Sequence, residues 1–434
     1  MKVLYDITVL GLGHIVPKAR TGIFRVIENV AEQLVINQEC EMLFCSGTDI
    51  DTINNSLKYL KDKKSFSHIP FSVSSILKKN DYKQKRLELI KSIHSSEHKS
   101  LITIFSSKVR VRNFMFKEKI IDLTQGDDCF IKPADLKSSS IYHSSFYPIP
   151  TQVKGSAIKA VFLTSYDLIP ILYPQFAEES VIELIQKVLQ SITPDTWVLC
   201  ISEATRNDLL NYLGNRVDPN KVKVTELAAS GTFYQSRNKA ANKEVRGKYG
   251  IPDAPYILSL CTLEPRKNID QAIRAFVKIV SQENVPELNL VLVGTKGWMF
   301  DKIFDEIKGS AGIKDRIIIT GYVPDEDLAA IYSDALLFVY PSFYEGFGLP
   351  PLEAMQCGVP VITSNTSSLP EVVGDAGIMV APTDLDALCQ GMLSIYNNPA
   401  LREKMVEKSI ERAGRFSWER CANETVEAYK SSLN

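Results

Sequence analysis

Two carboxylates, Glu345 and Glu353, lie eight residues apart in the segment YEGFGLPPLEAM. An apolar run, Ala335–Val339, comes shortly before them and is typical of a buried parallel strand. We expect Glu345 in the loop after this strand and Glu353 in a short helix from about Pro350 to Cys357, since proline is tolerated in a first helical turn. The intervening glycines let backbone amides approach a ligand, and a helix start favours phosphate. The pattern predicts a site for a ligand with a hydroxyl-rich end and an anionic middle.

A pair of cations, Arg266 and Lys267, follows Pro265 directly after another apolar run. Fixed cations stabilise the negative charge that grows on a diphosphate as its bond to a sugar breaks. Arginine offers a planar fork for phosphate oxygens, whereas lysine acts as a compact point charge. Taken alone, two adjacent cations are equally typical of a solvated loop. We expect Asn268 to be the N-cap of the helix that follows.

These motifs resemble those of the family-4 glycosyltransferases, retaining enzymes of GT-B fold that use nucleotide sugars. The stretch EGFGLPPLE (345–353) matches the family's E-x7-E signature. Three further stretches precede it in family order: CTLEPRKN (261–268), VGTKGW (293–298) and GYVPDEDL (321–328). The resemblance covers most of residues 200–420 strongly and the first 200 residues weakly.

The resemblance implies a role for each residue of the donor site. Arg266 and Lys267 would hold the diphosphate, and Glu353 would accept hydrogen bonds from two ribose hydroxyls. Glu345 would grip the sugar hydroxyls together with the amides that follow it. The catalytic residues it implies are Arg266, Lys267 and Glu345. The donor-binding residues it implies are Gly22, Arg266, Lys267, Tyr322, Val323, Glu345, Gly346, Phe347, Gly348, Leu349 and Glu353.

The first half of the chain departs from the family pattern at one position. The segment TSYDLIPILYP resembles the family's H-D-L-x-P, but Tyr166 stands where the family has a histidine that contacts the donor sugar. Tyr166 and Asp167 are therefore candidates to contact the acceptor or the sugar. Thr21 and Gly22 match a family T-G-I stretch, although a plain helix start explains them equally well.

The elements around these motifs alternate regularly in the second half of the chain. Short apolar strands separated by amphipathic helices specify a doubly wound parallel sheet, in which ligands bind at the carboxyl ends of strands. We predict strands at Tyr256–Leu260, Leu288–Val293, Arg316–Thr320, Ala335–Val339 and Val359–Thr363, and helices near 269–280, 299–308, 325–333, 351–357 and 384–396. Thr383 and Asp386 resemble a capping box at the last of these helices.

The first half shows the same alternation less clearly. We predict strands at Val3–Leu10, Glu41–Cys45, Leu101–Phe105, Ala160–Thr164, Trp197–Ser202 and Lys221–Leu227, and helices at Gly22–Val35 and Glu203–Leu213. Gly11 and Gly13 are expected in a loop. Residues 47–100 are polar and lysine-rich, which indicates an insertion, and residues 230–255 indicate an interdomain connection with one short helix.

We therefore expect an α/β protein of GT-B type, with two Rossmann-like doubly wound domains facing each other across a cleft. Residues 1–235 would form the acceptor domain and residues 236–414 the nucleotide-sugar domain. The resemblance implies that a C-terminal helix, 415–434, packs back on the first domain.

Composition bounds the setting in which the protein works. The chain of 434 residues is 45% hydrophobic and 23% charged, with a formal net charge of −1, as is ordinary for a globular protein. Residues 58–119 hold 16 Lys and Arg against 5 Asp and Glu, which indicates either a solvated insertion or a surface for anionic lipid or an anionic acceptor. The eight cysteines form no C-x-x-C pair, and we expect reduced thiols, no signal peptide and no membrane span. We predict a cytoplasmic protein, peripheral at the inner face of the cell membrane.

Three other motifs carry little weight. His94-Ser-Ser-Glu-His98 fits a zinc-peptidase pattern but lies in a basic stretch without helical periodicity. D-x-D pairs occur at Asp49, Asp325 and Asp384, in unrelated contexts. Gly11-Leu-Gly13 lacks the third glycine of a dinucleotide fingerprint.

The function we predict is hexosyl transfer with retention, by a front-face mechanism implied by the resemblance. UDP-glucose is the favoured donor and GDP-mannose the alternative, and the acceptor is a polysaccharide or a lipid-linked saccharide. We expect no metal, no cofactor and no nucleic-acid partner. An epimerase or phosphorylase on the same fold, a glycoside hydrolase using Glu345 and Glu353, and a non-catalytic nucleotide-sugar sensor stay open as alternatives.

Overall fold

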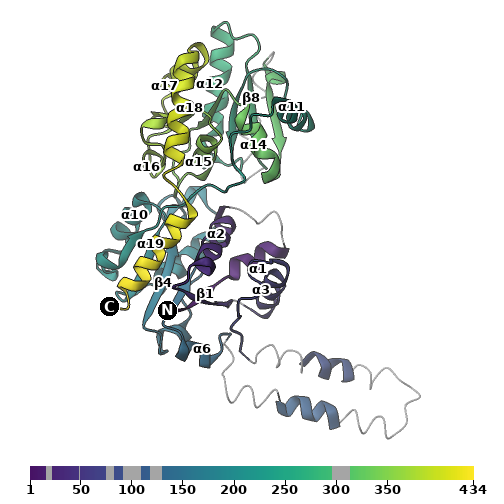
Figure 1. The fold of residues 1–434 in the computed structure, drawn as a ribbon, viewed down its shortest axis with the longest axis vertical. Helices are drawn as coiled ribbons and strands as arrows, with labels where there is room; N and C mark the ends of the chain where they lie inside the picture. Colours follow the sequence, from purple (N-terminus) through teal and green to yellow (C-terminus); the bar gives the residue numbers. More distant parts are fainter. Residues whose placement is uncertain (16–21, 48, 75–82, 91–108, 118–129, 296–312) are drawn as a thin grey trace, which may run out of the picture. The chain divides into compact units, whose positions relative to one another are not determined.

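The structure is a computed structural model, and it describes all residues except 16–21, 48, 75–82, 91–108, 118–129 and 296–312. The chain forms two compact units (Figure 1). One comprises Met1–Thr164, Lys187–Val198 and Val426–Asn434, and the other comprises Ser165–Gln186 and Leu199–Thr425. The division at residue 235 and the role of each domain stay predictions.

A six-stranded sheet forms from the first half of the chain. Its strand order is β2 (Glu41–Cys45), β1 (Lys2–Asp6), β3 (Ile141–Ser144), β4 (Ala160–Ser165), β5 (Thr196–Cys200) and β6 (Val222–Val224). β1 pairs in parallel with β2 and β3, and β3 pairs in parallel with β4. The described helices of this half are α1 (Thr8–Ile15), α2 (Gly22–Ile36), α3 (Ile50–Asp62), α6 (Pro133–Ser138), α7 (Thr151–Lys154), α8 (Ile169–Leu172), α9 (Glu179–Ser191), α10 (Glu203–Leu213) and two further helices at residues 83–90 and 109–117.

The first strand is shorter than predicted. It ends at Asp6, whose carboxylate accepts a hydrogen bond from the Thr8 amide at 2.7 Å, and α1 begins there. Gly11 and Gly13 therefore lie in a helix, not in a loop. A Cβ would come within 2.2 Å of Ser56 Oγ at Gly11 and within 2.3 Å of the Phe24 ring at Gly13. Both glycines are explained by the close packing of α1 against its neighbours.

Part of the predicted insertion is also helical. α3 is capped by Asp49, whose side chain accepts from the Thr52 amide at 2.8 Å, and it buries Ile53, Tyr59 and Leu60. Ile50, Ile53, Leu57 and Leu60 are three or four residues apart, so the helical period is present in the sequence although this helix was not predicted. The predicted strand at 101–105, the helix at 299–308 and the His94–His98 motif lie outside the described residues.

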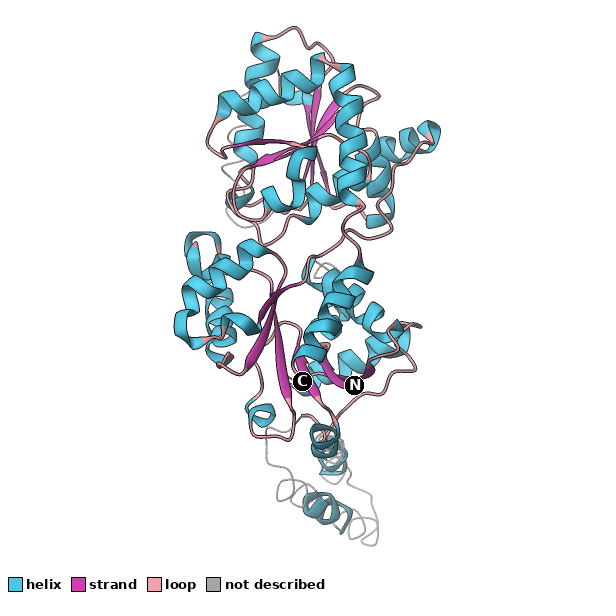
Figure 2. Ribbon diagram, turned by 60° about the vertical axis from the view of Figure 1, so that its left-hand side comes forward, coloured by secondary structure: helices cyan, strands magenta, loops and turns pink. Residues whose placement is uncertain are grey.

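The second sheet confirms the predicted doubly wound parallel arrangement (Figure 2). Its order is β12 (Ile378–Val380), β11 (Val361–Ser364), β10 (Leu337–Tyr340), β7 (Tyr256–Leu260), β8 (Asn289–Val293) and β9 (Ile317–Gly321). Every neighbouring pair is parallel. The helices are α11 (Lys239–Lys248), α12 (Ile269–Gln282), α14 (Asp325–Ser333), α15 (Leu349–Gln356), α16 (Leu369–Val373), α17 (Leu385–Asn397) and α18 (Pro399–Ala413). The last helix, α19 (Trp418–Ser431), begins in this unit and ends in the first, with the division at Val426. β12, α16 and α18 were not predicted.

Helix caps differ from expectation at two places. Asp384, not Thr383, caps α17, and its side chain accepts from the Ala387 amide at 2.9 Å. Asn268 is the N-cap residue of α12, as predicted, but its side chain makes no cap hydrogen bond. Asp49, Asp325 and Asp384, which begin the D-x-D pairs, all lie at helix starts, where a carboxylate is favoured by the helix dipole.

In the second sheet, the direction of winding reverses between two neighbouring strands, β7 and β10. From β7 the chain winds outward through β8 and β9, then returns to β10 on the other side of β7 and winds outward through β11 and β12. β7 and β10 are therefore neighbours at the point where the winding reverses. Ligands of such sheets bind in the crevice outside the carboxyl ends of the strands at this point.

Burial agrees with the expected thiol chemistry. The seven cysteines within the described ranges are all free and buried. Among the described residues, no helix is both long enough and apolar enough to cross a bilayer.

Candidate active site

The loops after β7 and β10 meet at the carboxyl edge of the second sheet. The loop after β7 carries Arg266 and Lys267 in a short 3-10 turn, Pro265–Lys267. The backbone carbonyl of Arg266 accepts a hydrogen bond from the Phe343 amide at 2.9 Å. The two cations are thereby fixed against the loop that carries Glu345.

Glu345 binds both cations directly. Its Oε1 lies 2.7 Å from Lys267 Nζ, and its Oε2 lies 2.9 Å from Arg266 Nη1. Ser342 Oγ donates to the same Oε1 at 2.6 Å. The structure thus brings together all three residues predicted to be catalytic.

Two further groups hold the cations in place. Arg266 Nη2 lies 2.7 Å from Glu264 Oε1, and Lys267 Nζ donates to the Tyr340 hydroxyl at 2.7 Å. The cluster therefore contains two cations and two carboxylates, with no net charge. Glu264, Tyr340 and Ser342 were missed in the sequence because they are common residue types in ordinary loop and strand positions.

The electrostatics of the cluster keep its members charged. Burial alone would raise the pKa of the Glu345 carboxyl, but the charges of Arg266 and Lys267 outweigh burial and lower the pKa to about 2. Desolvation would lower the pKa of Arg266, but Glu345 and Glu264 raise it above its usual value. Burial raises the pKa of Tyr340 well above its usual range, so its hydroxyl remains protonated. A fixed ionic cluster at this edge can exchange an internal partner for the oxygens of an incoming anion.

Asn268 is the N-cap residue of α12, but its side chain supports the geometry of this site. Its backbone is left-handed, with φ of 54°, which asparagine tolerates better than most residues. Its buried Nδ2 donates to the carbonyls of Pro341 at 2.9 Å and Pro382 at 2.7 Å. It ties the loop after β7 to the loop after β10.

The glycine-rich loop after Glu345 is tightly packed. A Cβ at Gly346 would lie 2.4 Å from the Tyr166 carbonyl oxygen, so only glycine fits without a shift. Gly348 has φ of 118°, a conformation that glycine alone adopts readily. Phe347 is buried with its ring 5.9 Å from that of Phe416. Leu349 begins α15, and because Pro350 and Pro351 have no N–H, this helix start offers fewer phosphate donors than an ordinary one.

Glu353 is deeply buried in this structure. Its side chain is 2% exposed, and its Oε2 accepts from the Tyr332 hydroxyl at 3.4 Å. Tyr322, at the end of β9, is 63% exposed, whereas Val323 is buried. The ribose role of Glu353 and the base role of the 322–323 turn stay predictions.

The candidates from the first half lie in different units. Tyr166 and Asp167 belong to the same unit as Glu345, and Asp167 Cβ would lie 3.0 Å from a Cβ at Gly346. Burial raises the pKa of Asp167, and the charge of Arg266 opposes the rise. Gly22 begins α2 in the other unit, and its part in diphosphate binding stays a prediction.

Comparison with known proteins identifies the family of this chain. Residues 241–412, which include the whole cluster, match the family model described as glycosyl transferases group 1. The chain is also 36% identical over 292 residues to O-antigen chain mannosyltransferase B of Escherichia coli. This match covers 67% of this chain and 74% of that protein. The chain belongs to the group 1 glycosyl transferases. The prediction of a hexosyltransferase of the family-4 type is confirmed.

Two other proteins are similar to this glycosyltransferase, one in sequence and one in fold. It is 27% identical over 296 residues to the serotype-specific mannosyltransferase WbdA of Escherichia coli, but the match spans only 36% of that protein. Its fold is similar to that of sucrose-phosphate synthase from Thermosynechococcus elongatus, with a TM-score of 0.64 at 18% identity over 99% of this chain and 98% of that one. The GT-B fold of the glycosyltransferase is thereby confirmed.

Proposed function

We propose that the protein is a mannosyltransferase that uses GDP-mannose to extend a cell-surface polysaccharide. The observation that carries this proposal is the 36% identity to O-antigen chain mannosyltransferase B, together with 27% identity to a second mannosyltransferase. The proposal therefore replaces UDP-glucose, the donor favoured by the sequence analysis, with GDP-mannose.

The ionic cluster gives the reaction its electrostatics. In the proposed step, the bond between the anomeric carbon and the diphosphate oxygen breaks, and the acceptor oxygen bonds to the anomeric carbon on the same face of the sugar. The configuration is therefore retained. The acceptor proton passes to the leaving diphosphate. Arg266 and Lys267 meet the charge that grows on the diphosphate, and a fixed donor of this kind is typically worth roughly 100- to 1,000-fold in rate.

Glu345 acts on the sugar side of the same cluster. When the diphosphate takes over the two cations, the Glu345 carboxylate loses part of its internal pairing. It then accepts hydrogen bonds from hydroxyls of the transferred hexose, and charged acceptors form the stronger bonds. The structure of the cluster supports this exchange because Glu345 lies within hydrogen-bond distance of both cations.

The enzyme requires no divalent metal in this proposal. Arg266 and Lys267 supply the positive charge that a metal would otherwise bring to the diphosphate. EDTA should leave the rate unchanged, and loss of activity in EDTA that Mg²⁺ restores would contradict this part.

The acceptor in this proposal is a lipid-linked saccharide, so the enzyme works at an anionic membrane face. The support is the similarity to an O-antigen chain mannosyltransferase and the basic stretch at residues 58–119.

A donor panel tests the proposed function. Purified protein is incubated with a lipid-linked saccharide acceptor and GDP-mannose, UDP-glucose or ADP-glucose, and product is measured by mass. Transfer from GDP-mannose at a kcat/KM at least tenfold above the other donors supports the proposal. Preferred transfer from UDP-glucose would return the donor to the earlier expectation, and donor breakdown without an acceptor would favour a hydrolase.

A further inference from the structure

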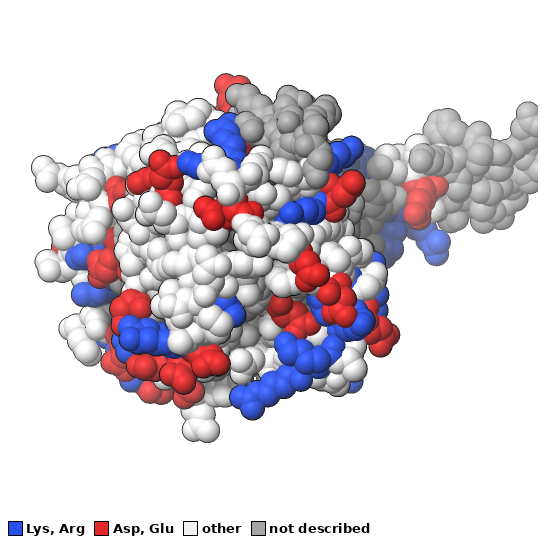
Figure 3. Space-filling view, turned by 90° about the horizontal axis from the view of Figure 1, so that it is seen from above, with Lys and Arg blue, Asp and Glu red and all other residues white. Residues whose placement is uncertain are grey.

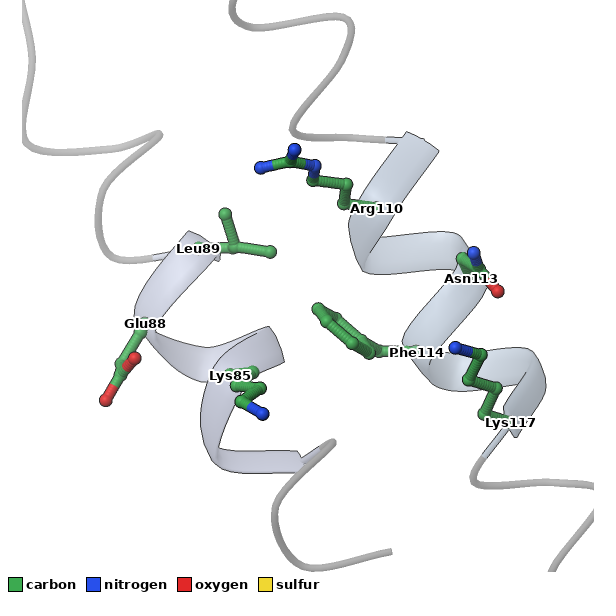
Figure 4. Close-up of a pocket in the computed structure, with 7 residues that line it drawn as sticks. All are labelled: Lys85, Glu88, Leu89, Arg110, Asn113, Phe114 and Lys117. Atoms are coloured by element: carbon green, nitrogen blue, oxygen red, sulfur yellow. The ribbon is translucent and has the colours of Figure 1, made fainter. Parts of the chain in front are cut away.

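Two helices in the basic stretch, residues 83–90 and 109–117, enclose a cavity of about 530 Å³ (Figure 4). We call them the arm helices. Lys85, Glu88 and Leu89 line the cavity from the first helix, and Arg110, Asn113, Phe114 and Lys117 line it from the second. The positions in each set are three or four residues apart, so each set covers one face of its helix.

Charge is strongly one-sided on the arm helices. Their residues include six cations (Lys83, Lys85, Arg86, Arg110, Arg112 and Lys117) and one carboxylate, Glu88. The face of the molecule in Figure 3 instead shows Lys and Arg mixed with Asp and Glu. A net charge of +5 on two short helices attracts an anionic surface.

Large apolar side chains are also exposed on the arm helices. Val109, Met115 and Phe116 are 53%, 52% and 64% exposed, and Leu87 is 39% exposed. These are four of the twelve exposed large hydrophobic residues found in the described part of the chain, although the arm helices are short. Met115 and Phe116 lie beside cations on the same helix.

We propose that the arm helices form a docking surface for an anionic phospholipid bilayer. Lysine and arginine side chains around the cavity donate hydrogen bonds to lipid phosphate groups, and Leu89 and Phe114 line its apolar part. Met115 and Phe116 enter the headgroup boundary, as apolar residues of basic interfacial helices do. Charge argues against a second copy of this chain as the occupant, because two surfaces of +5 repel each other.

This inference rests on the proposed membrane-linked acceptor for its purpose but is measured independently of it. The test uses the full chain and vesicles, with no donor or acceptor present. Failure of vesicle binding therefore leaves the donor specificity intact, and failure of the donor panel leaves the docking surface intact.

Vesicle co-sedimentation compares four proteins. They are the unmodified chain, the charge variant R110Q/R112Q/K117Q, the apolar variant M115S/F116S and the control K58Q/K61Q/K64Q. The control removes the same charge from exposed lysines of the same basic stretch. Vesicles contain phosphatidylcholine alone or phosphatidylcholine with phosphatidylglycerol, and circular dichroism of each variant shows that it is folded.

The proposal predicts binding to phosphatidylglycerol vesicles that weakens with salt and is much weaker with phosphatidylcholine alone. The charge variant should lose affinity on the order of 100-fold, since each of its three cations near an anionic surface contributes about fivefold. The apolar variant should lose roughly tenfold or more, and the control should stay within about threefold. Equal losses in control and charge variant, equal binding to both vesicles, or dimer formation abolished by M115S/F116S with vesicle binding unchanged would overturn it.

Discussion

Lys267 Nζ lies 2.7 Å from Glu345 Oε1, although the two residues are 78 positions apart in the chain. The Glu345 carboxylate thus pairs with the cation that is proposed to bind the donor's diphosphate. Glu345 and the diphosphate therefore compete for the same positive charge. This relationship determines how each member of the cluster should respond to substitution.

Replacing Glu345 by glutamine should strengthen diphosphate binding while slowing transfer. The variant removes a competing negative charge, so GDP should bind roughly three- to thirtyfold more tightly. It also removes the charged acceptor for the hexose, so kcat should fall on the order of 100-fold. Calorimetry with GDP and steady-state kinetics measure the two effects. Glu283→Gln, an exposed carboxylate after α12, is the control, and weaker GDP binding by Glu345→Gln would sink the competition argument.

Replacing Lys267 by alanine should depress kcat roughly 100- to 1,000-fold, with a smaller effect on the KM for donor. The charge that Lys267 meets is largest in the transition state, and interactions made mainly there affect kcat. Steady-state kinetics with GDP-mannose give both constants. A variant with raised KM and unchanged kcat would show that Lys267 binds substrate and transition state equally.

The positions of Lys267 and Glu345 were each predictable, but their contact was not. Apolar runs such as NLVLV (289–293) identify strands directly, and the motifs follow the strand ends. The contact depends on the sheet order, in which β7 and β10 are neighbours, and no local pattern reveals that order. The roles expected for Lys267 and Glu345 came from the resemblance to a family. Their partners Tyr340 and Ser342, and Glu264 beside Arg266, became visible only in the fold.

Buried polar residues concealed one of the strands that were missed, β3. β3 contains His143 and Ser144, both buried, which weakened its strand signal. His143 is satisfied by Thr164 Oγ1 at 2.8 Å and by the Tyr429 hydroxyl at 2.5 Å, far away in the sequence. Such partners are visible only in the folded chain.

Replacing Gly346 by alanine should destabilise the protein and lower activity. The added Cβ would lie 2.4 Å from the Tyr166 carbonyl, so the loop must shift, at a typical cost of about 1–3 kcal/mol. Gly247→Ala in α11 is the matched control, because a Cβ there meets nothing within 4 Å and alanine is favoured in a helix by about 0.5–1 kcal/mol. Urea unfolding compares the two variants, and equal stability of both would contradict the packing argument.

Titration of the buried Asp6 carboxyl should make the stability of the protein depend on pH. Burial raises its pKa to about 6, above the usual 3.8, while hydrogen bonds from Thr8 oppose the rise. The folded state therefore binds this proton more tightly than the unfolded state, and the resulting stabilisation, complete below about pH 3.8, is lost as pH rises through 6. Asp6→Asn, which keeps an acceptor for the Thr8 amide, should gain stability relative to the unmodified protein between pH 4 and pH 7. Denaturant unfolding across this range measures the difference, which a structural role without titration would leave constant.

Calorimetric GDP binding tests the central claim most directly, namely that the cations after β7 hold the donor's diphosphate. Three proteins are compared: the unmodified chain, Lys267→Gln and Lys278→Gln. Lys278 is a lysine of α12 whose side chain pairs with Asp386, and its loss changes the net charge equally. The account predicts a loss of roughly 10- to 150-fold in GDP affinity for Lys267→Gln and unchanged affinity for Lys278→Gln. Equal GDP affinity in all three proteins would contradict it.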